Sequence, residues 1–147
     1  MSSPASAFVW TDRYKLGYER MDDTHRDFVE KVDALLGAGD TELAARLDAF
    51  IAHAEAHFDE EKEWMQSTGF PAADCHIDEH AAVMKSVLEV RELLSASPGT
   101  RAFDATRSLA RALVDWFPGH ATYLDSALSA WMCKRVYGGK PVVFHRD

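Results

Sequence analysis

The sequence lacks several features that would assign it to particular classes of protein. No stretch approaches the roughly 18–20 consecutive apolar residues of a membrane-spanning helix. The first residues have neither a basic start nor an apolar run long enough for a signal peptide. Lys and Arg number 16 against 24 Asp and Glu, and no basic patch stands out, which argues against nucleic acid or an anionic membrane surface as a partner. We therefore expect a soluble, cytoplasmic protein.

Cysteine is also scarce, with Cys75 and Cys133 as the two examples in 147 residues. They are too few and too far apart for a disulfide framework. Cys75 adjoins His76 and is considered as a thiolate ligand, but it lies one position off the helical face that His76 shares with His80. A cysteine of this kind is more often a small buried apolar residue. The metal ligands predicted below are therefore nitrogen and oxygen donors.

Apolar residues recur at helical spacing along most of the chain, and no segment alternates long enough to be a convincing strand. With 47% hydrophobic residues and an ordinary domain length, residues 1–147 should form a single domain. The pattern predicts helices at about 22–37, 41–68, 72–95 and 101–137. Because the breaks between them are short, consecutive helices should be antiparallel. The predicted fold is all-α, an antiparallel up-down-up-down four-helix bundle.

The two ends of the chain carry apolar residues outside the predicted helices. The N-terminal arm, residues 1–20, contains Phe8, Trp10, Tyr14, Leu16 and Tyr18. We expect it to pack as a strap against the helices, because free termini seldom carry so much apolar surface. The tail, residues 138–147, contains Val142, Val143 and Phe144. It is expected to dock on a monomeric domain, with weak self-association through these residues as the alternative.

Each predicted helix also places polar residues on its inward, apolar stripe. Two pairs lie four residues apart and so share a helical face, His57 with Glu61 and His76 with His80. The full inward set is His25 from the first helix, His57 and Glu61 from the second, His76 and His80 from the third, and His120 and Asp125 from the fourth. The two remaining histidines, His53 and His145, fall outside this set.

A cluster of seven buried polar side chains requires a physical explanation. A single histidine on such a stripe is more often an ordinary core residue with a local hydrogen bond. Seven together would cost about 1–3 kcal/mol for each unsatisfied group, against a total stability of about 5–15 kcal/mol. Bound metal ions remove this cost. Seven ligands exceed what one ion accepts, and nitrogen and oxygen donors favour iron, manganese or zinc. Because a structural zinc would use four ligands, two iron ions fit better.

At these residues the chain resembles the hemerythrins, which are non-haem di-iron proteins that bind oxygen. The resemblance runs from Val9-Trp10 to about Lys134. It rests on the motifs Asp22-Asp23-Thr24-His25, His57-Phe58-x-x-Glu61 with Met65, His76-x-x-x-His80 and Trp116-x-x-x-His120-x-x-x-x-Asp125. It implies one iron held by His76, His80 and His120 and a second held by His25 and His57. Glu61 and Asp125 would bridge both ions beside an oxo or hydroxo group.

The resemblance also implies a function. The donors sum to six for the first iron and five for the second, which leaves one open position beside His25 and His57. In the family, dioxygen binds there reversibly as hydroperoxide, so the expected role is oxygen storage, transport or delivery. We expect an oxygen-binding protein and not an enzyme, although weak oxidase or peroxidase activity is compatible with the site. An oxygen or redox sensor and a di-iron oxidase or peroxidase are the alternatives.

The residues around the fourth-helix ligands depart from an ordinary helical pattern. Pro118-Gly119 stands immediately before His120, where a proline predicts a kink. His120 and Asp125 are five residues apart, about 140° around an ideal helix. A local distortion such as a single π-type turn would bring both inward. Ala121 either opens a small channel towards the centre or is compensated by Tyr123 or the tail. Phe58, Trp116 and Phe117 either shield the open position or are ordinary core aromatics.

Overall fold

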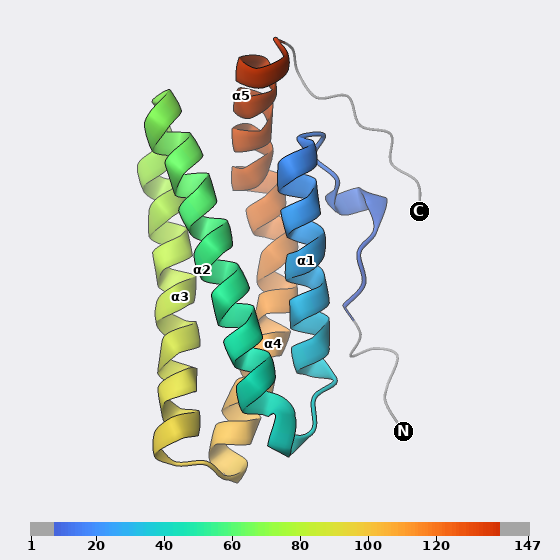
Figure 1. Cartoon of the computed structure of the whole chain (residues 1–147), viewed down its shortest axis with the longest axis vertical. Helices are drawn as coiled ribbons and strands as arrows, with labels where there is room; N and C mark the ends of the chain where they lie inside the picture. The colour runs from blue at the N-terminus through green and yellow to red at the C-terminus, as the bar shows by residue number, and fades with distance from the viewer. Residues whose placement is uncertain (1–7, 139–147) are drawn as a thin grey trace.

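The structure is a computed structural model, and it describes residues 8–138. Five helices carry most of these residues: α1 (Glu19–Leu36), α2 (Leu43–Thr68), α3 (Ala73–Ala96), α4 (Thr100–His120) and α5 (Ser126–Tyr137). A π-helical segment, Ala121–Asp125, joins α4 to α5, so that the two form one continuous column (Figure 1). Predictions that concern Val142, Val143, Phe144 and His145 lie outside the described residues.

The four helical columns form a bundle in which consecutive columns run in opposite directions (Figure 1). α1 packs against α2 and α4, α2 packs against α3, and α3 packs against α4. Residues 8–138 contain no strand. The predicted all-α four-helix bundle is therefore confirmed. Within the same range, no helix is long and apolar enough to cross a membrane.

The turn between α2 and α3 shows how the sequence ends one helix and starts the next. Gly69 adopts a left-handed conformation, with φ of 68°, which a residue without a Cβ adopts at little cost. The backbone N–H of Phe70 then donates to the carbonyl of Met65, at 2.9 Å, and satisfies one of the last carbonyls of α2. Pro71 follows, and α3 begins at Ala73. This short reversal places the two pairs of candidate ligands on facing helices.

The interior consists of two hydrophobic clusters with a polar layer between them. The larger cluster contains Phe28, Phe58 and Phe117, and the smaller one contains Met21, Met65 and Leu128. Each column therefore passes from one cluster to the other. In α1, for example, His25 lies between Met21 and Phe28 along the chain. The predicted polar residues occupy the layer at this crossing.

The N-terminal arm packs against the bundle as predicted, as far as residues 8–18 are concerned. In Figure 1 it runs along the outer side of α1. Phe8 is buried, and its ring and that of Tyr14 lie 6.0 and 5.3 Å from the ring of Phe117 in α4. The backbone N–H of Phe8 donates to Oδ1 of Asp33 at 2.9 Å. The arm therefore covers the larger hydrophobic cluster.

A buried aspartate anchors the end of the arm that joins α1. The carboxylate of Asp22 accepts hydrogen bonds from the backbone N–H groups of Leu16 and Gly17, at 2.8 and 3.0 Å. The hydroxyl of Ser129 in α5 donates to the carbonyl of Leu16 at 3.2 Å. Leu16 is thus tied to the first and the last helix of the described chain, which fixes where the arm enters the bundle.

Candidate metal centre

The structure brings together all seven of the predicted polar residues. None of them is more than 5% exposed. Their side chains form two groups suited to holding a metal ion, one of Glu61, His76, His80, His120 and Asp125 and one of His25, His57 and Glu61. We call the part around His25 and His57 the two-histidine half, and the part around His76, His80 and His120 the three-histidine half. Glu61 belongs to both groups.

The two carboxylates divide their oxygens between the two halves. In the two-histidine half, Oδ2 of Asp125 lies 3.1 Å from Nε2 of His25, and Oε2 of Glu61 lies 2.7 Å from Nε2 of His57. The other oxygen of each carboxylate faces Nε2 of His76, at 2.9 Å for Asp125 Oδ1 and 3.3 Å for Glu61 Oε1. Each carboxylate is therefore placed to bridge two ions.

Nε2 of His57 and Oε2 of Glu61 form a hydrogen bond, but most of the other converging donor atoms do not bond one another. Nε2 of His25, Nε2 of His76 and both oxygens of Asp125 are buried and have no hydrogen-bond partner within residues 8–138. The same is true of Oε1 of Glu61. Buried polar atoms in folded proteins normally have partners, because leaving them without one costs about 1–3 kcal/mol. Buried donor atoms that converge on one place, several of them without a partner, are what a set of metal ligands requires, so the residues present fit metal ions.

The last two candidate ligands meet because of the π-helical segment. At the end of Ala121–Asp125 the backbone N–H of Ser126 donates to the carbonyl of Ala121, five residues before it. Residues five apart then come close to one full turn, and Oδ1 of Asp125 lies 3.2 Å from Nε2 of His120. The predicted π-type turn is therefore confirmed. α4 continues through Pro118 to His120, and the departure from α-helical geometry comes directly after it.

The charges in the metal-free cluster balance through protonated imidazoles. Burial by itself would lower the pKa of His25, but the carboxylates of Asp125 and Glu61 outweigh burial and raise the pKa to about 10. The same competition raises the pKa of His76 to about 9. His80 differs, because burial dominates and lowers its pKa to about 3. Metal ions binding near neutral pH must therefore displace protons from His25 and His76.

Two buried phenylalanine rings lie against the two-histidine half, although a polar surface pocket is also lined by its His57. The ring of Phe117 meets the ring of His25 edge-on at 5.2 Å, and the ring of Phe28 lies 6.2 Å from that of His57. Both phenylalanines are fully buried. Phe117 thus has the shielding position that was one of its two predicted roles. The sequence did not identify Phe28 as a shielding residue, because its spacing is that of any apolar residue on the inward face of a helix.

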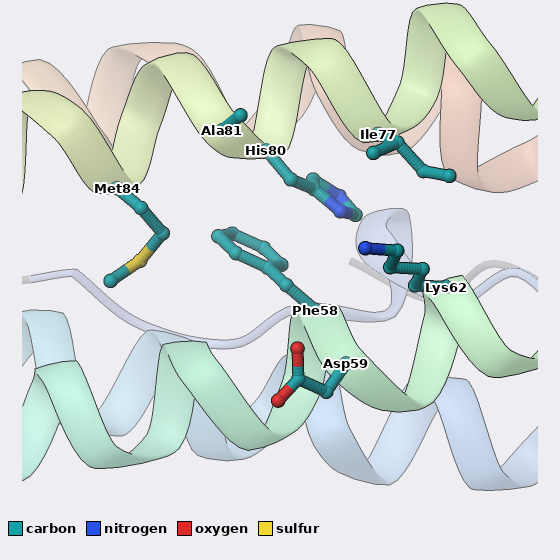
Figure 2. A pocket seen from close by; sticks show the side chains of 7 residues that line it. All are labelled: Phe58, Asp59, Lys62, Ile77, His80, Ala81 and Met84. Carbon is teal, nitrogen blue, oxygen red and sulfur yellow. The ribbon is translucent and has the colours of Figure 1, made fainter.

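Aromatic rings also stack on the three-histidine half, but closer to the surface. Phe58 lies flat against His80, with ring centroids 3.9 Å apart and 11° between planes, and Trp116 stacks on His120 at 4.2 Å. Figure 2 shows Phe58 from α2 and His80 from α3 next to each other in the lining of a pocket that Met84 and Lys62 also line. This pocket has a volume of about 170 Å³. Trp116, which was considered for the two-histidine half, belongs to the other half.

The family of the chain follows from comparison with known proteins. The model of the hemerythrin HHE cation binding domain matches residues 16–131. The chain belongs to the hemerythrin family. It is 35% identical over 130 residues to a bacteriohemerythrin of Ralstonia nicotianae, covering 86% of this chain and 89% of that protein. It is also 27% identical over 123 residues to a bacteriohemerythrin of Stenotrophomonas maltophilia, covering 81% and 77%.

A third relative matches a shorter part of this hemerythrin domain. A hemerythrin chain of Sipunculus nudus is 29% identical over 80 residues, which is 54% of this chain and 65% of that protein. The hemerythrin family is one of non-haem iron proteins that bind oxygen. The buried layer of histidines and carboxylates described above is the part of this hemerythrin domain that could hold such a metal.

Two residues of the hemerythrin domain differ from their sequence-based interpretation. His53, which was set outside the inward set, has a side chain only 8% exposed, and its ring lies 5.4 Å from that of His57. Its spacing of four residues from His57 was the available signal. Nδ1 of His53 lies 2.7 Å from Oδ2 of Asp27.

Cys75 is exposed, contrary to the expectation of a small buried residue, whereas Cys133 is buried. Neither cysteine is in the two groups of candidate ligands.

Proposed function

We propose that this hemerythrin domain holds two iron ions and binds dioxygen reversibly, for storage, transport or delivery of oxygen in the cytoplasm. The observation that carries the proposal is the division of carboxylate oxygens between a half with three histidines and a half with two. His76, His80 and His120 would hold one ion, His25 and His57 the other, and Glu61 and Asp125 would hold both. Two bound ferrous ions would supply the two electrons needed to reduce dioxygen reversibly to the level of peroxide.

The unequal number of histidines decides where a small molecule binds. With the carboxylates shared, the two-histidine half supplies one protein donor fewer than the other half. A ligand position is therefore left for dioxygen beside His25 and His57. Phe28 and Phe117 place hydrocarbon beside this position, which limits the access of water and of the protons that water carries. Exclusion of protons favours release of oxygen unchanged.

The donor types favour binding over oxidation of a substrate. Di-iron sites of the ferritin-like class are rich in carboxylates and use Glu-x-x-His motifs. The present set has five imidazoles and two carboxylates, so its charge is less negative and the higher oxidation states used by oxidases are less stabilised. We therefore consider reversible oxygen binding a better match to the site than an oxidase or peroxidase activity.

One structural feature favours a sensor as the second candidate. The rings of Phe8 and Tyr14 in the N-terminal arm lie against Phe117, and Phe117 lies against His25. A single side chain thus separates the arm from the half where oxygen would bind. A shift of Phe117 on oxygen binding would be transmitted directly to the arm.

The test is anaerobic loading with ferrous iron, followed by admission of oxygen and then argon. A visible charge-transfer band that appears with oxygen and disappears under argon supports reversible binding. Rapid conversion to a ferric form with release of hydrogen peroxide favours the oxidase. Failure of the protein to take up iron refutes both. His57→Gln should abolish the band, whereas the matched control His53→Gln, one turn away on α2, should retain it.

A further inference from the structure

One of the five candidate histidine ligands differs from the others in what its outer nitrogen contacts. Nδ1 of His120 lies 2.7 Å from Oε1 of Glu79. The Nδ1 atoms of His25, His57, His76 and His80 have no hydrogen-bond partner within residues 8–138. A carboxylate attached to one ligand of the three-histidine half therefore distinguishes that half from the other.

The same carboxylate oxygen also binds the ring that stacks on His120. Nε1 of Trp116 donates to Oε1 of Glu79 at 3.1 Å. The planes of Trp116 and His120 are 25° apart, with centroids at 4.2 Å. Glu79 comes from α3, next to the ligand His80, while Trp116 and His120 come from α4. One side chain thus holds a ligand and its neighbouring ring from across the helix interface.

The hydrogen-bond chemistry of these groups fixes the direction of the bond. An ionised carboxylate only accepts hydrogen bonds, so His120 must carry its proton on Nδ1 to bind Glu79. In the neutral ring the lone pair is then on Nε2, the atom that faces the centre. Nε2 of His80 lies 3.0 Å from Nε2 of His120, a contact in which one of the two nitrogens carries the hydrogen.

We propose that Glu79 is a positioning residue that holds His120 in the Nδ1–H tautomer and makes it the strongest nitrogen donor of the site. The part of this inference that concerns iron rests on the proposed function. A carboxylate hydrogen-bonded to a ligating imidazole increases its basicity and fixes the orientation of the ring. Electron density donated through His120 should stabilise the ferric form of the three-histidine half relative to the ferrous form.

The position of Glu79 makes it more than a packing residue. Its side chain is 40% exposed, so it fills little space in the core, and its contacts with His120 and Trp116 are polar. The energy of burial therefore contributes little to its role. What Glu79 provides is a negative charge at the outer side of one imidazole, a feature that no described residue provides for the other four candidate ligands.

The experiment compares Glu79→Gln and Glu79→Ala with a matched control, Asp78→Asn. Asp78 is the exposed neighbour on α3, and its variant removes the same charge without touching a candidate ligand. Nitrogen-15 NMR of the histidine rings in the metal-free protein reports the tautomer of His120. Ferrous iron affinity and the reduction potential of the iron-loaded protein are then measured on the same variants, with circular dichroism as the check on folding.

In the wild type and in Asp78→Asn, His120 should show the Nδ1–H tautomer. In Glu79→Ala this preference should be lost, and iron affinity should fall by about 10- to 100-fold. Glu79→Gln keeps an acceptor oxygen but not the charge, so the tautomer should persist while the reduction potential rises. If Glu79→Ala fails to fold, Glu79→Gln still tests the inference, because a role in packing alone would leave its potential at the value of Asp78→Asn.

The two proposals fail in different ways. A wild type that binds iron and oxygen, with both Glu79 variants matching Asp78→Asn in tautomer and potential, would overturn the role of Glu79 and leave the proposed function intact. A wild type that binds no iron would overturn the proposed function and the iron part of this inference. The tautomer of His120 in metal-free Glu79→Ala would then confirm or refute the positioning role by itself.

Discussion

The two halves of the metal centre share both carboxylates but have different surroundings. The two-histidine half lies against the buried rings of Phe28 and Phe117. The three-histidine half is held by the partly exposed Glu79. Surface pockets are lined by one histidine of each half, His80 and His57. Buried aromatic rings therefore lie behind one half, and a carboxylate is bound to a histidine of the other. The two halves share the same carboxylates, but the residues next to their histidines make them chemically different.

Removal of a shared carboxylate should have the largest effect, because it damages both halves at once. Glu61→Ala should abolish binding of iron at either half. It also leaves the charge of buried imidazoles uncompensated, which should destabilise the metal-free protein by about 3–5 kcal/mol. Iron per chain and urea unfolding are the measurements. Glu63→Ala, exposed on the same helix, is the control, and equal iron content in the two variants would contradict a bridging role for Glu61.

Truncation of one aromatic in each half should separate shielding from general packing. Phe117→Ala removes a buried ring next to His25, which should cost about 3–5 kcal/mol, and Trp116→Ala removes a partly buried ring that stacks on His120. The Phe117 variant should in addition lose bound oxygen to oxidation faster, because water then reaches the two-histidine half. Autoxidation is followed by the decay of the visible band. Equal acceleration in the two variants would show that neither half is specially shielded.

The pH dependence of the metal-free protein should reveal one protonated histidine in each half. His25 and His76 have folded-state pKa values raised to about 10 and about 9, above the ordinary value of 6.5. Between pH 6.5 and these values the unfolded chain binds fewer protons than the folded one, so stability is full below pH 6.5 and falls as pH rises towards 9–10.

The slope should be at most about 1.4 kcal/mol per pH unit for each of the two groups. Urea unfolding of the metal-free protein from about pH 6 to about pH 10 provides the measurement. His25→Gln should remove the part of the slope that extends to the highest pH, and His80→Gln should leave the slope above about pH 7 unchanged. Stability that rises over this range would contradict the assigned charges.

The smallest effect is expected at the anchor of the arm, which lies outside both halves. Asp22→Asn keeps one acceptor oxygen for the backbone of Leu16 or Gly17 and should cost about 1–2 kcal/mol. Asp23→Asn, exposed on the next position, is the control. Thermal unfolding reports the difference. Iron content should stay at the wild-type level in both variants, and its loss in Asp22→Asn would show that the arm contributes to the site.

Periodicity in the sequence predicted much of this arrangement, and the exceptions have physical causes. The spacing of five between His120 and Asp125 predicted the π-type turn, because two inward ligands at that spacing are incompatible with an ideal helix. Glu79 left no such signal, since a glutamate beside a polar helix face is ordinary and its partner is on another helix. Ala121 was ambiguous in sequence. The structure buries it in the larger cluster and exposes Tyr123, so Tyr123 does not cover it.

Spacing along the chain was enough to predict the helices, the bundle and the seven inward polar residues, because each of these follows from local periodicity. Spacing could not predict which oxygen of Glu61 and Asp125 faces which half, or which aromatic ring stands behind which histidine. Those relations depend on how the columns are rotated and packed against one another. That rotation is set by the fit of the two hydrophobic clusters on either side of the polar layer, and no single segment of sequence contains it.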